Sequence, residues 1–143
     1  MTTTVHAPVK RSTRQRSAIQ AVIDAAGRPL SPPEVLKVAQ AEVPALSLAT
    51  VYRNLKLLVD AAEIAVVMLP GESARYESPR HAHHHHFQCT LCKRVFDVHG
   101  CPGDLAYLAP KGFTVEDHEL TLYGRCDECP TLRKTARGAG ARK

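Results

Sequence analysis

The sequence lacks several features that would place it in other protein classes. No apolar run approaches the roughly 20 residues needed to cross a bilayer. The first residues, MTTTVHAPVKRS, have no apolar stretch after their basic residues, which argues against a secretory signal peptide. There is no recognisable nucleophile motif and no paired general acid and base. We therefore expect a cytoplasmic protein that makes no membrane contact and is not an enzyme.

Acidic residues are scarce in the N-terminal part of the chain. Residues 1–56 carry eight Lys and Arg against three Asp and Glu, whereas residues 57–143 carry eleven of each. The net charge of +5 therefore comes entirely from the N-terminal part. A basic module of this kind favours an anionic partner, most simply nucleic acid.

The chain has only five cysteines, an odd number, so they cannot all form disulfide pairs with one another. In the cytoplasm thiols stay reduced, so spaced cysteines favour metal binding over disulfides. Four form two C-x-x-C pairs with 33 residues between them, and four thiolates suit a structural zinc ion that has no open position. An iron–sulfur cluster or a redox pair is a weaker alternative, because the usual spacings and the adjacent strand–helix pattern are missing. The predicted zinc ligands are Cys89, Cys92, Cys126 and Cys129; for the fifth, Cys101, we favour a packing role over a ligand or redox role.

Capping signals predict three helices in the N-terminal half. They cover residues 12–26, with Ser12 and Gln15 as a capping box, residues 31–42, and a segment from Ser47 to Leu58. Two strands, 64–69 and 74–77, follow around a Pro-Gly turn. This order is typical of a winged helix-turn-helix, whose third helix enters the major groove of DNA. A plain three-helix bundle with a solvated basic face fits the pattern equally well.

The composition changes after residue 79, where we place a domain boundary, so that residues 1–79 and 80–143 form two domains. The second domain is expected to contain strands at 86–90, 94–98 and 118–123, with a helix over 102–109. The fold class is then α+β, with a winged helix-turn-helix followed by a small α/β domain that holds the four cysteines.

Five histidines precede the first strand of the second domain: His81, His83, His84, His85 and His86. Strand alternation sends 83 and 85 to one side and 84 and 86 to the other, which predicts two half-sites. Glu77, Asp97, Asp104 and His118 are near in sequence or strand order. Metal binding is therefore favoured over a solvated histidine-rich loop, although this donor set leaves zinc, iron and manganese all feasible.

Taken together, Thr50–Leu55 (TVYRNL), Tyr76-Glu77, the histidine run and the two C-x-x-C pairs resemble the ferric uptake regulator superfamily. The resemblance covers roughly residues 12–130. It implies a bacterial homodimeric repressor with an N-terminal winged helix and a C-terminal dimerisation domain. Members of this superfamily sense iron, zinc, manganese, nickel or peroxide.

The resemblance also implies roles for individual residues. The four paired cysteines match the structural zinc ligands, and Glu77, His84 and His86 match three ligands of a regulatory site at the domain hinge. Pro29 stands where many members have a fourth ligand, a histidine, and His81 is our hypothetical replacement. A second site in the dimerisation domain is matched by His83, His85, Asp104 and His118.

The resemblance alone does not determine which metal the protein senses. Peroxide-sensing relatives have an aspartate where this chain has Ser78 and a histidine where it has Pro29, so peroxide sensing is disfavoured. Three imidazoles and one carboxylate suit tetrahedral zinc, and we expect zinc sensing, as in the zinc uptake regulator branch, with Fe²⁺ as the alternative. A zinc buffer and a metalloenzyme are the remaining rivals.

The expected partner is a palindromic double-stranded operator, bound by a homodimer. Contacts to bases and phosphates would come from the start of the third helix and from the basic N-terminus. The residues concerned are Lys10, Arg14, Arg16, Ser47, Ala49, Thr50, Tyr52 and Arg53.

Overall fold

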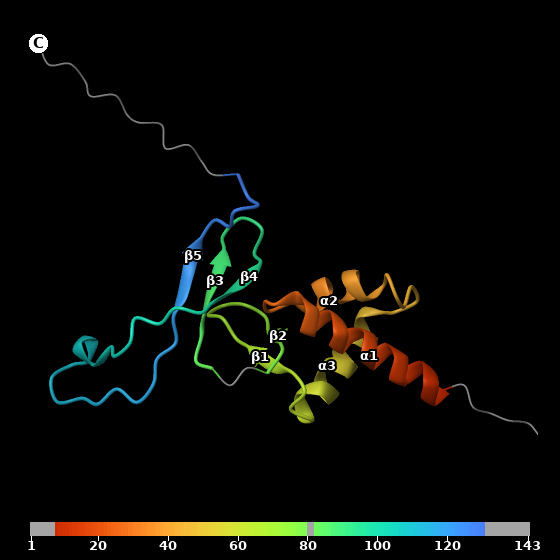
Figure 1. Cartoon of the computed structure of the whole chain (residues 1–143), viewed down its shortest axis with the longest axis horizontal. Coiled ribbons are helices and arrows are strands. Elements are labelled where there is room, and N and C mark those ends of the chain that lie inside the picture. Colours follow the sequence, from red (N-terminus) through yellow and green to blue (C-terminus); the bar gives the residue numbers. More distant parts are fainter. Residues whose placement is uncertain (1–7, 80–81, 131–143) are drawn as a thin grey trace, which may run out of the picture.

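The computed structural model describes residues 8–79 and 82–130. Its N-terminal part contains three helices and a two-stranded antiparallel sheet, and its C-terminal part contains a three-stranded sheet (Figure 1). The elements are α1 (Pro8–Ala26), α2 (Pro32–Ala39), α3 (Leu48–Asp60), β1 (Ala65–Val67), β2 (Arg75–Glu77), β3 (His85–Cys89), β4 (Val95–Val98), a 3₁₀ turn η1 (Ala106–Leu108) and β5 (Thr121–Gly124).

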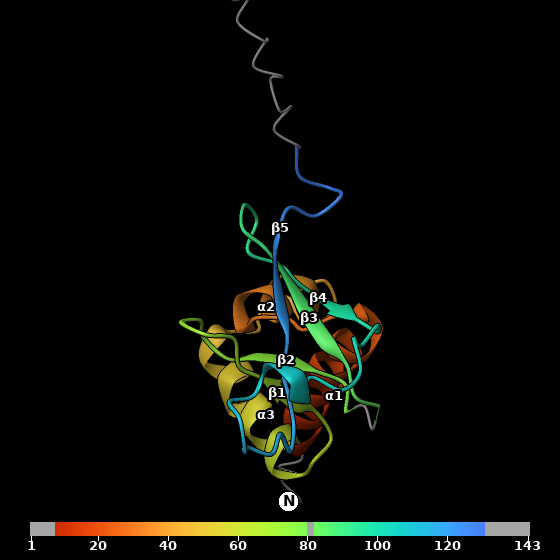
Figure 2. The same cartoon turned by 90° about the vertical axis from the view of Figure 1, so that its left-hand side faces the viewer.

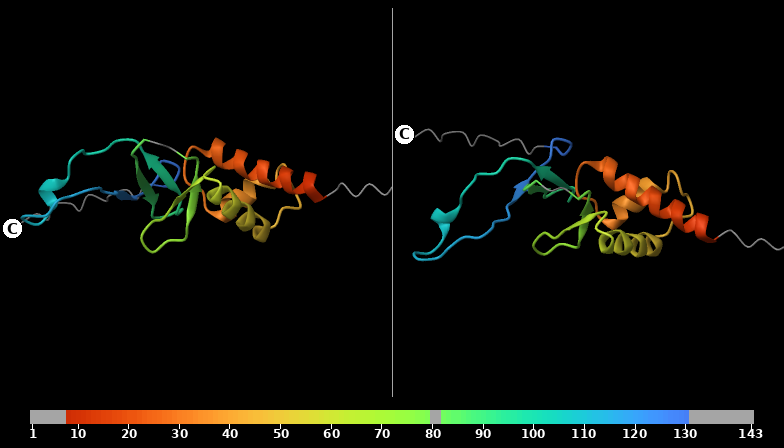
Figure 3. Two further views of the ribbon diagram at one scale, coloured as in Figure 1. Left: turned by 90° about the horizontal axis from the view of Figure 1, so that it is seen from below. Right: turned by 60° about the horizontal axis from the view of Figure 1, so that its bottom comes forward.

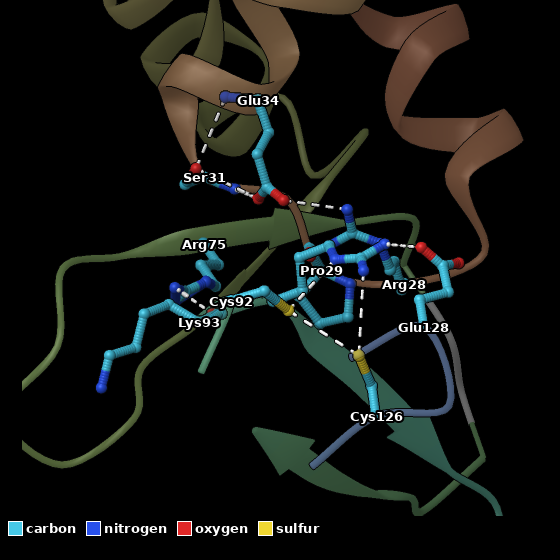
Figure 4. Close-up of polar contacts among 10 residues, drawn as sticks. Arg28, Pro29, Ser31, Glu34, Arg75, Cys92, Lys93, Cys126 and Glu128 are labelled. Carbon is cyan, nitrogen blue, oxygen red and sulfur yellow. Dashed lines mark hydrogen bonds and ion pairs between the residues drawn. The ribbon is translucent and has the colours of Figure 1, made fainter. Parts of the chain in front are cut away.

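Two of the three predicted helix starts are confirmed. Ser31 and Glu34 form a reciprocal capping box on α2, in which Ser31 N donates to Glu34 Oε2 at 2.8 Å (Figure 4). Ser47 caps α3, because its hydroxyl accepts from Thr50 N at 3.2 Å. The expected capping box at Ser12 is wrong, since α1 already includes residue 8 and Ser12 lies inside the helix.

The helices bury one contiguous apolar core. Its members come from all three helices and from the segments that follow each of them: Ile19, Ile23, Leu30, Val35, Ala39, Leu46, Val51, Leu55, Leu58 and Ile64. Strands β1 and β2 pair antiparallel, and Leu30 adds an isolated bridge to Tyr76. Three helices followed by this β-hairpin form the winged helix-turn-helix arrangement rather than a plain bundle.

The second sheet has the order β4-β3-β5, antiparallel between β3 and β4 and parallel between β3 and β5. The predicted strands are present with ends shifted by up to three residues. The predicted helix over 102–109 is wrong, because only the 3₁₀ turn at 106–108 forms. Gly103, with a φ of +87°, and Pro110 bracket this turn and prevent a longer helix.

The helices lie on one side of the β3 sheet, and residues 99–120 extend away from it on the other side (Figures 2 and 3). Strand β2 ends at Glu77 and β3 begins at His85, on either side of the predicted domain boundary. The boundary itself stays a prediction. Among the described residues, no helix is long and apolar enough to span a membrane.

Candidate metal centres and DNA-binding surface

The first metal centre is the group of four cysteines, which two tight turns bring together. Their sulfurs lie within 4.8 Å of one another. The Cys89–Cys129 and Cys92–Cys126 separations are 3.7 Å and 3.8 Å. Zinc–sulfur bonds of about 2.3 Å in a tetrahedron place neighbouring sulfurs about 3.8 Å apart. The geometry therefore fits a four-coordinate zinc ion.

The pKa values of these thiols differ widely. Backbone N–H groups of Cys92 and Cys126, each 3.5 Å from Cys89 Sγ, lower the pKa of Cys89 to about 5. Hydrogen bonding to Cys126 and burial raise the pKa of Cys129 to about 12. Without a metal the four thiols therefore cannot all ionise near neutral pH, whereas zinc binds all four as thiolates.

Arg94 is a neighbour of this centre that the sequence did not single out. Its guanidinium donates to Cys92 Sγ at 3.3 Å and to Glu128 at 2.7 Å. Its Nη2 also lies 3.8 Å from Cys126 Sγ. Because it is a cation beside two sulfurs, it lowers the pKa of Cys92 and orients both C-x-x-C turns.

The second centre, which we call the hinge cluster, consists of Glu77, His84, His86 and Asp97. Glu77 ends β2, His86 is on β3, and Asp97 faces His86 across the β3–β4 pairing. His84 Nε2 lies 2.9 Å from Glu77 Oε1, and His86 Nε2 lies 3.7 Å from Asp97 Oδ1. Strand β2 belongs to one sheet, whereas β3 and β4 belong to the other, so the hinge cluster joins the two parts of the molecule.

The charges of the hinge cluster show that it favours a positive group. Burial alone would raise the pKa of Glu77, but contacts with His86, Asp97 and His84 outweigh it and leave the pKa below its ordinary value. Burial alone would lower the pKa of His84, yet its hydrogen bond to the Ala82 carbonyl and the charge of Glu77 raise it. Two carboxylates in a partly desolvated site thus favour a proton or a metal cation between them.

One backbone contact determines how His84 presents its ring. Its Nδ1 lies 3.1 Å from the Ala82 carbonyl oxygen, which can only accept a hydrogen bond. Nδ1 therefore carries a proton, and in neutral His84 the lone pair is on Nε2, facing Glu77. This is the usual arrangement of a metal-binding histidine whose second nitrogen bonds to a carbonyl group.

Two expectations about the hinge can be compared with the structure. Pro29 is fully buried and offers no ligand, and its carbonyl accepts a hydrogen bond from Arg28. His81, the hypothetical replacement, lies outside the described residues. Asp97 brings a fourth donor into the cluster instead. Its position opposite His86 in the β3–β4 register could have been found only from correct strand pairing.

A third group, the arm cluster, lies on the opposite face of β3. It contains His83, His85, Cys101 and His118, with donor atoms within 4.8 Å of one another. Asp104 does not join it, and its Oδ1 instead accepts from Ala106 N at 2.8 Å. Cys101 is exposed, so the expectation that it packs as a buried small residue is wrong. A cleft of about 260 Å³ is lined by histidines of both the hinge and the arm clusters.

The predicted DNA-contacting residues lie on α1 and at the start of α3. The side chains of Lys10, Arg14, Ser47, Ala49, Tyr52 and Arg53 are exposed, whereas Arg16 and Thr50 are half-buried. Arg14 donates to the Glu42 carbonyl at 3.0 Å, and Arg16 pairs with Glu63 at 3.4 Å. A surface hollow is lined by residues of both helices, including Arg11, Thr50 and Arg53. The two arginines in its lining give it a charge that suits a phosphate group.

Comparison with known proteins assigns the chain to a family. The model of the "Ferric uptake regulator family" matches residues 9–123. The chain belongs to the ferric uptake regulator family. It is 31% identical over 124 residues to the peroxide operon regulator of Bacillus subtilis, covering 83% of each chain. It is 32% identical over 108 residues to the ferric uptake regulation protein of Cupriavidus metallidurans, covering 72% of this chain and 76% of that one.

Solved structures of the family share the fold. A zinc-bound manganese uptake regulator superposes with a TM-score of 0.68 at 27% identity, covering 78% of this chain and 87% of that one. The ferric uptake regulator from Francisella tularensis with iron gives 0.62 at 27% identity, covering 80% and 90%. This member of the ferric uptake regulator family is accordingly a metal-dependent, DNA-binding transcriptional repressor with a four-cysteine zinc site, and not an enzyme.

Proposed function

We propose that this regulator senses zinc at the hinge cluster and binds a palindromic operator as a cytoplasmic homodimer when the metal is present. The observation that carries the proposal is the convergence of Glu77 from β2 with His86 and Asp97 from the second sheet and with His84, which directly precedes β3. A site built from both parts of the molecule changes their relative orientation when it fills. The two winged helices of a dimer can then match two half-sites.

The donors of the hinge cluster explain how the chain holds the ion. A zinc ion bound there would supply the positive charge that two carboxylates at close range require. Ala82 orients His84, and the β3–β4 register places Asp97 opposite His86. Glu77 is the ligand from the winged-helix side, so its position on β2 couples metal binding to the orientation of α3. By linkage, operator binding must then tighten metal binding by the same factor.

An iron-responsive regulator is the alternative. Two imidazoles and two carboxylates contain more oxygen than the three-imidazole site expected with His81, and oxygen-rich sites suit Fe²⁺ and Mn²⁺. A set of only four donors favours zinc, since the oxygen-preferring ions usually take six ligands. Peroxide sensing stays disfavoured, because it depends on residues that this chain replaces with Ser78 and Pro29.

The test is metal removal followed by add-back. An operator is first selected from random duplex DNA with zinc-loaded protein. The hinge metal is then removed with a chelator under conditions that keep one zinc per chain, as checked by mass spectrometry. DNA binding, measured by fluorescence anisotropy, should be lost and restored by Zn²⁺ at a lower free concentration than by Fe²⁺, Mn²⁺ or Ni²⁺. Restoration by Fe²⁺ but not Zn²⁺ would show an iron sensor, and binding indifferent to chelation would refute the switch.

Glu77→Gln provides the matched variant. It should weaken the activating metal at least about tenfold, because a neutral amide cannot replace an anionic ligand. Glu42→Gln removes the same charge from an exposed site far from the hinge and should leave the metal dependence unchanged. Equal metal dependence in both variants would exclude Glu77 as a ligand.

A further inference from the structure

The arm cluster contains a cysteine where the family resemblance led us to expect a carboxylate. Cys101 Sγ lies 3.3 Å from His118 Nε2, and His118 Nε2 lies 3.4 Å from His83 Nε2. His83 Nε2 lies 3.0 Å from His85 Nε2. Three imidazole nitrogens and one sulfur from three separate segments of the chain thus face one point.

These separations fit one ion. Zinc–nitrogen bonds of about 2.0–2.1 Å and a zinc–sulfur bond of about 2.3 Å give tetrahedral edges of about 3.3–3.6 Å. The contacts to His118 lie within or close to this range, and the His83–His85 contact is slightly shorter. Within residues 8–79 and 82–130, the sulfur has one further hydrogen bond, which it accepts from the backbone N–H of Gly103 at 3.4 Å.

From this geometry we infer that His83, His85, Cys101 and His118 form a thiolate-containing zinc site, with Cys101 as a ligand in place of Asp104. Asp104 is occupied with the Ala106 N–H and stands outside the group. A thiolate with three imidazoles suits zinc better than iron or manganese, because those ions prefer oxygen donors. The Cys101 thiol releases its proton to solvent when the sulfur binds the ion.

His85 must change its tautomer to take part. It is 2% exposed, and its Nδ1 accepts from Leu120 N at 3.2 Å, so in the metal-free neutral ring the proton is on Nε2 and points to His83. Coordination by Nε2 moves this proton to Nδ1 and breaks the Leu120 hydrogen bond. The Leu120 N–H then loses its acceptor, and metal coordination must outweigh that loss.

The site has a structural consequence for residues 99–120. This segment has little core of its own: Tyr107, Leu108 and Phe113 are 77%, 68% and 71% exposed. An ion held by Cys101, His118 and β3 would close the segment into a loop and fix its base on the sheet. The arm cluster would then stabilise the fold whether or not the hinge cluster is the sensor.

Cobalt spectroscopy tests the ligand assignment. Co²⁺ is titrated into protein whose four-cysteine site is filled with zinc, and absorption is recorded in the near ultraviolet. A sulfur-to-cobalt charge-transfer band should appear, since the arm cluster contains a thiolate. Cobalt at the hinge cluster gives no such band, because that cluster has no sulfur.

The Cys101→Ser variant should lose the band and bind this cobalt at least about tenfold more weakly. It retains the same four paired cysteines, so any exchange into that site appears in both proteins and cancels in the difference spectrum. Asp104→Asn is the matched control and should keep band and affinity. A band unchanged in Cys101→Ser, absent from the wild type, or lost in Asp104→Asn would overturn the assignment. Metal-dependent DNA binding of the same variants reports separately on the hinge cluster.

Discussion

At the scale of single residues, the side chain of Arg53 is held in place by its neighbours at the start of α3. Its guanidinium donates to Thr50 Oγ1 at 3.1 Å, and that oxygen lies 2.9 Å from Ser47 Oγ. These contacts hold the exposed arginine at the helix N-terminus, where backbone N–H groups also favour an anion. We propose that Arg53 contacts a DNA phosphate, a contact that positions a protein on DNA without reading sequence.

Arg53→Ala should weaken operator binding by about five- to tenfold and reduce the salt slope of the affinity by about 1, because one phosphate contact is lost. The measurement is anisotropy titration at several salt concentrations. Lys111→Ala, which removes an exposed positive charge from the other end of the molecule, should leave both quantities unchanged. Equal salt slopes for Arg53→Ala and wild type would contradict this docking.

At the scale of one element, α2 depends on the charge of Glu34. One of its carboxylate oxygens caps the Ser31 N–H, and the other accepts from Arg28 at 2.8 Å (Figure 4). Burial alone would raise the pKa of Glu34, but the contacts with Ser31 and Arg28 together outweigh it and lower the pKa. A lowered pKa means that ionised Glu34 stabilises the fold above its unfolded pKa of about 4.3 and that this stability is lost as the pH falls through the folded pKa.

Glu34→Gln should therefore lower the free energy of unfolding at pH 7 by about 1 kcal/mol, with a deficit that shrinks in acid as the wild-type carboxylate protonates. Denaturant titrations at pH 7 and pH 4 measure the difference. Glu63→Gln, which breaks only the exposed Arg16 ion pair, should change stability by less than about 0.5 kcal/mol. A deficit independent of pH would show that packing rather than charge is responsible.

At the scale of the whole molecule, the four-cysteine site also contacts the winged helix. Arg75 on β2 is 7% exposed, and its Nη2 donates to the Lys93 carbonyl at 2.8 Å (Figure 4). Lys93 directly follows Cys92 and has a φ of +64°. Arg28 lies over the Phe96 ring of β4 at 5.5 Å. The zinc-held turn therefore supports the same domain arrangement that brings the hinge cluster together.

Strand β5 has an exposed surface at which two copies of the chain could form a dimer. It is one of the two edge strands of its sheet, and its residues Leu122 and Tyr123 are 51% and 54% exposed. An open strand edge with apolar side chains suits a second copy of the chain. This agrees with the proposed homodimer.

Leu122→Asp should raise the dimer dissociation constant at least about tenfold, because a buried unpaired charge at an interface is costly. Sedimentation velocity at several protein concentrations measures the change. Val38→Asp, at an equally exposed valine of α2, should leave the dimer intact. A wild-type monomer, or a Leu122→Asp variant that dimerises normally, would refute an interface at β5.

The sequence determined those features that local rules control. Ser31 and Ser47 marked helix starts through side-chain oxygens that reach only three residues along the chain, and the cysteine pairs indicated one zinc site because a C-x-x-C turn presents both sulfurs. Period-two alternation correctly separated His84 and His86 from His83 and His85. It did so without any knowledge of their partners.

Only the tertiary structure decided which distant residues complete each centre. Asp97 joins the hinge cluster through strand register. Cys101 rather than Asp104 joins the arm cluster, and Asp104 instead accepts a hydrogen bond from the Ala106 N–H, at a short 3₁₀ turn where a helix was expected. Arg94 and Arg75 likewise act across contacts between segments far apart in sequence. Register and loop path depend on the packing of the whole chain, and no local pattern of residues encodes them.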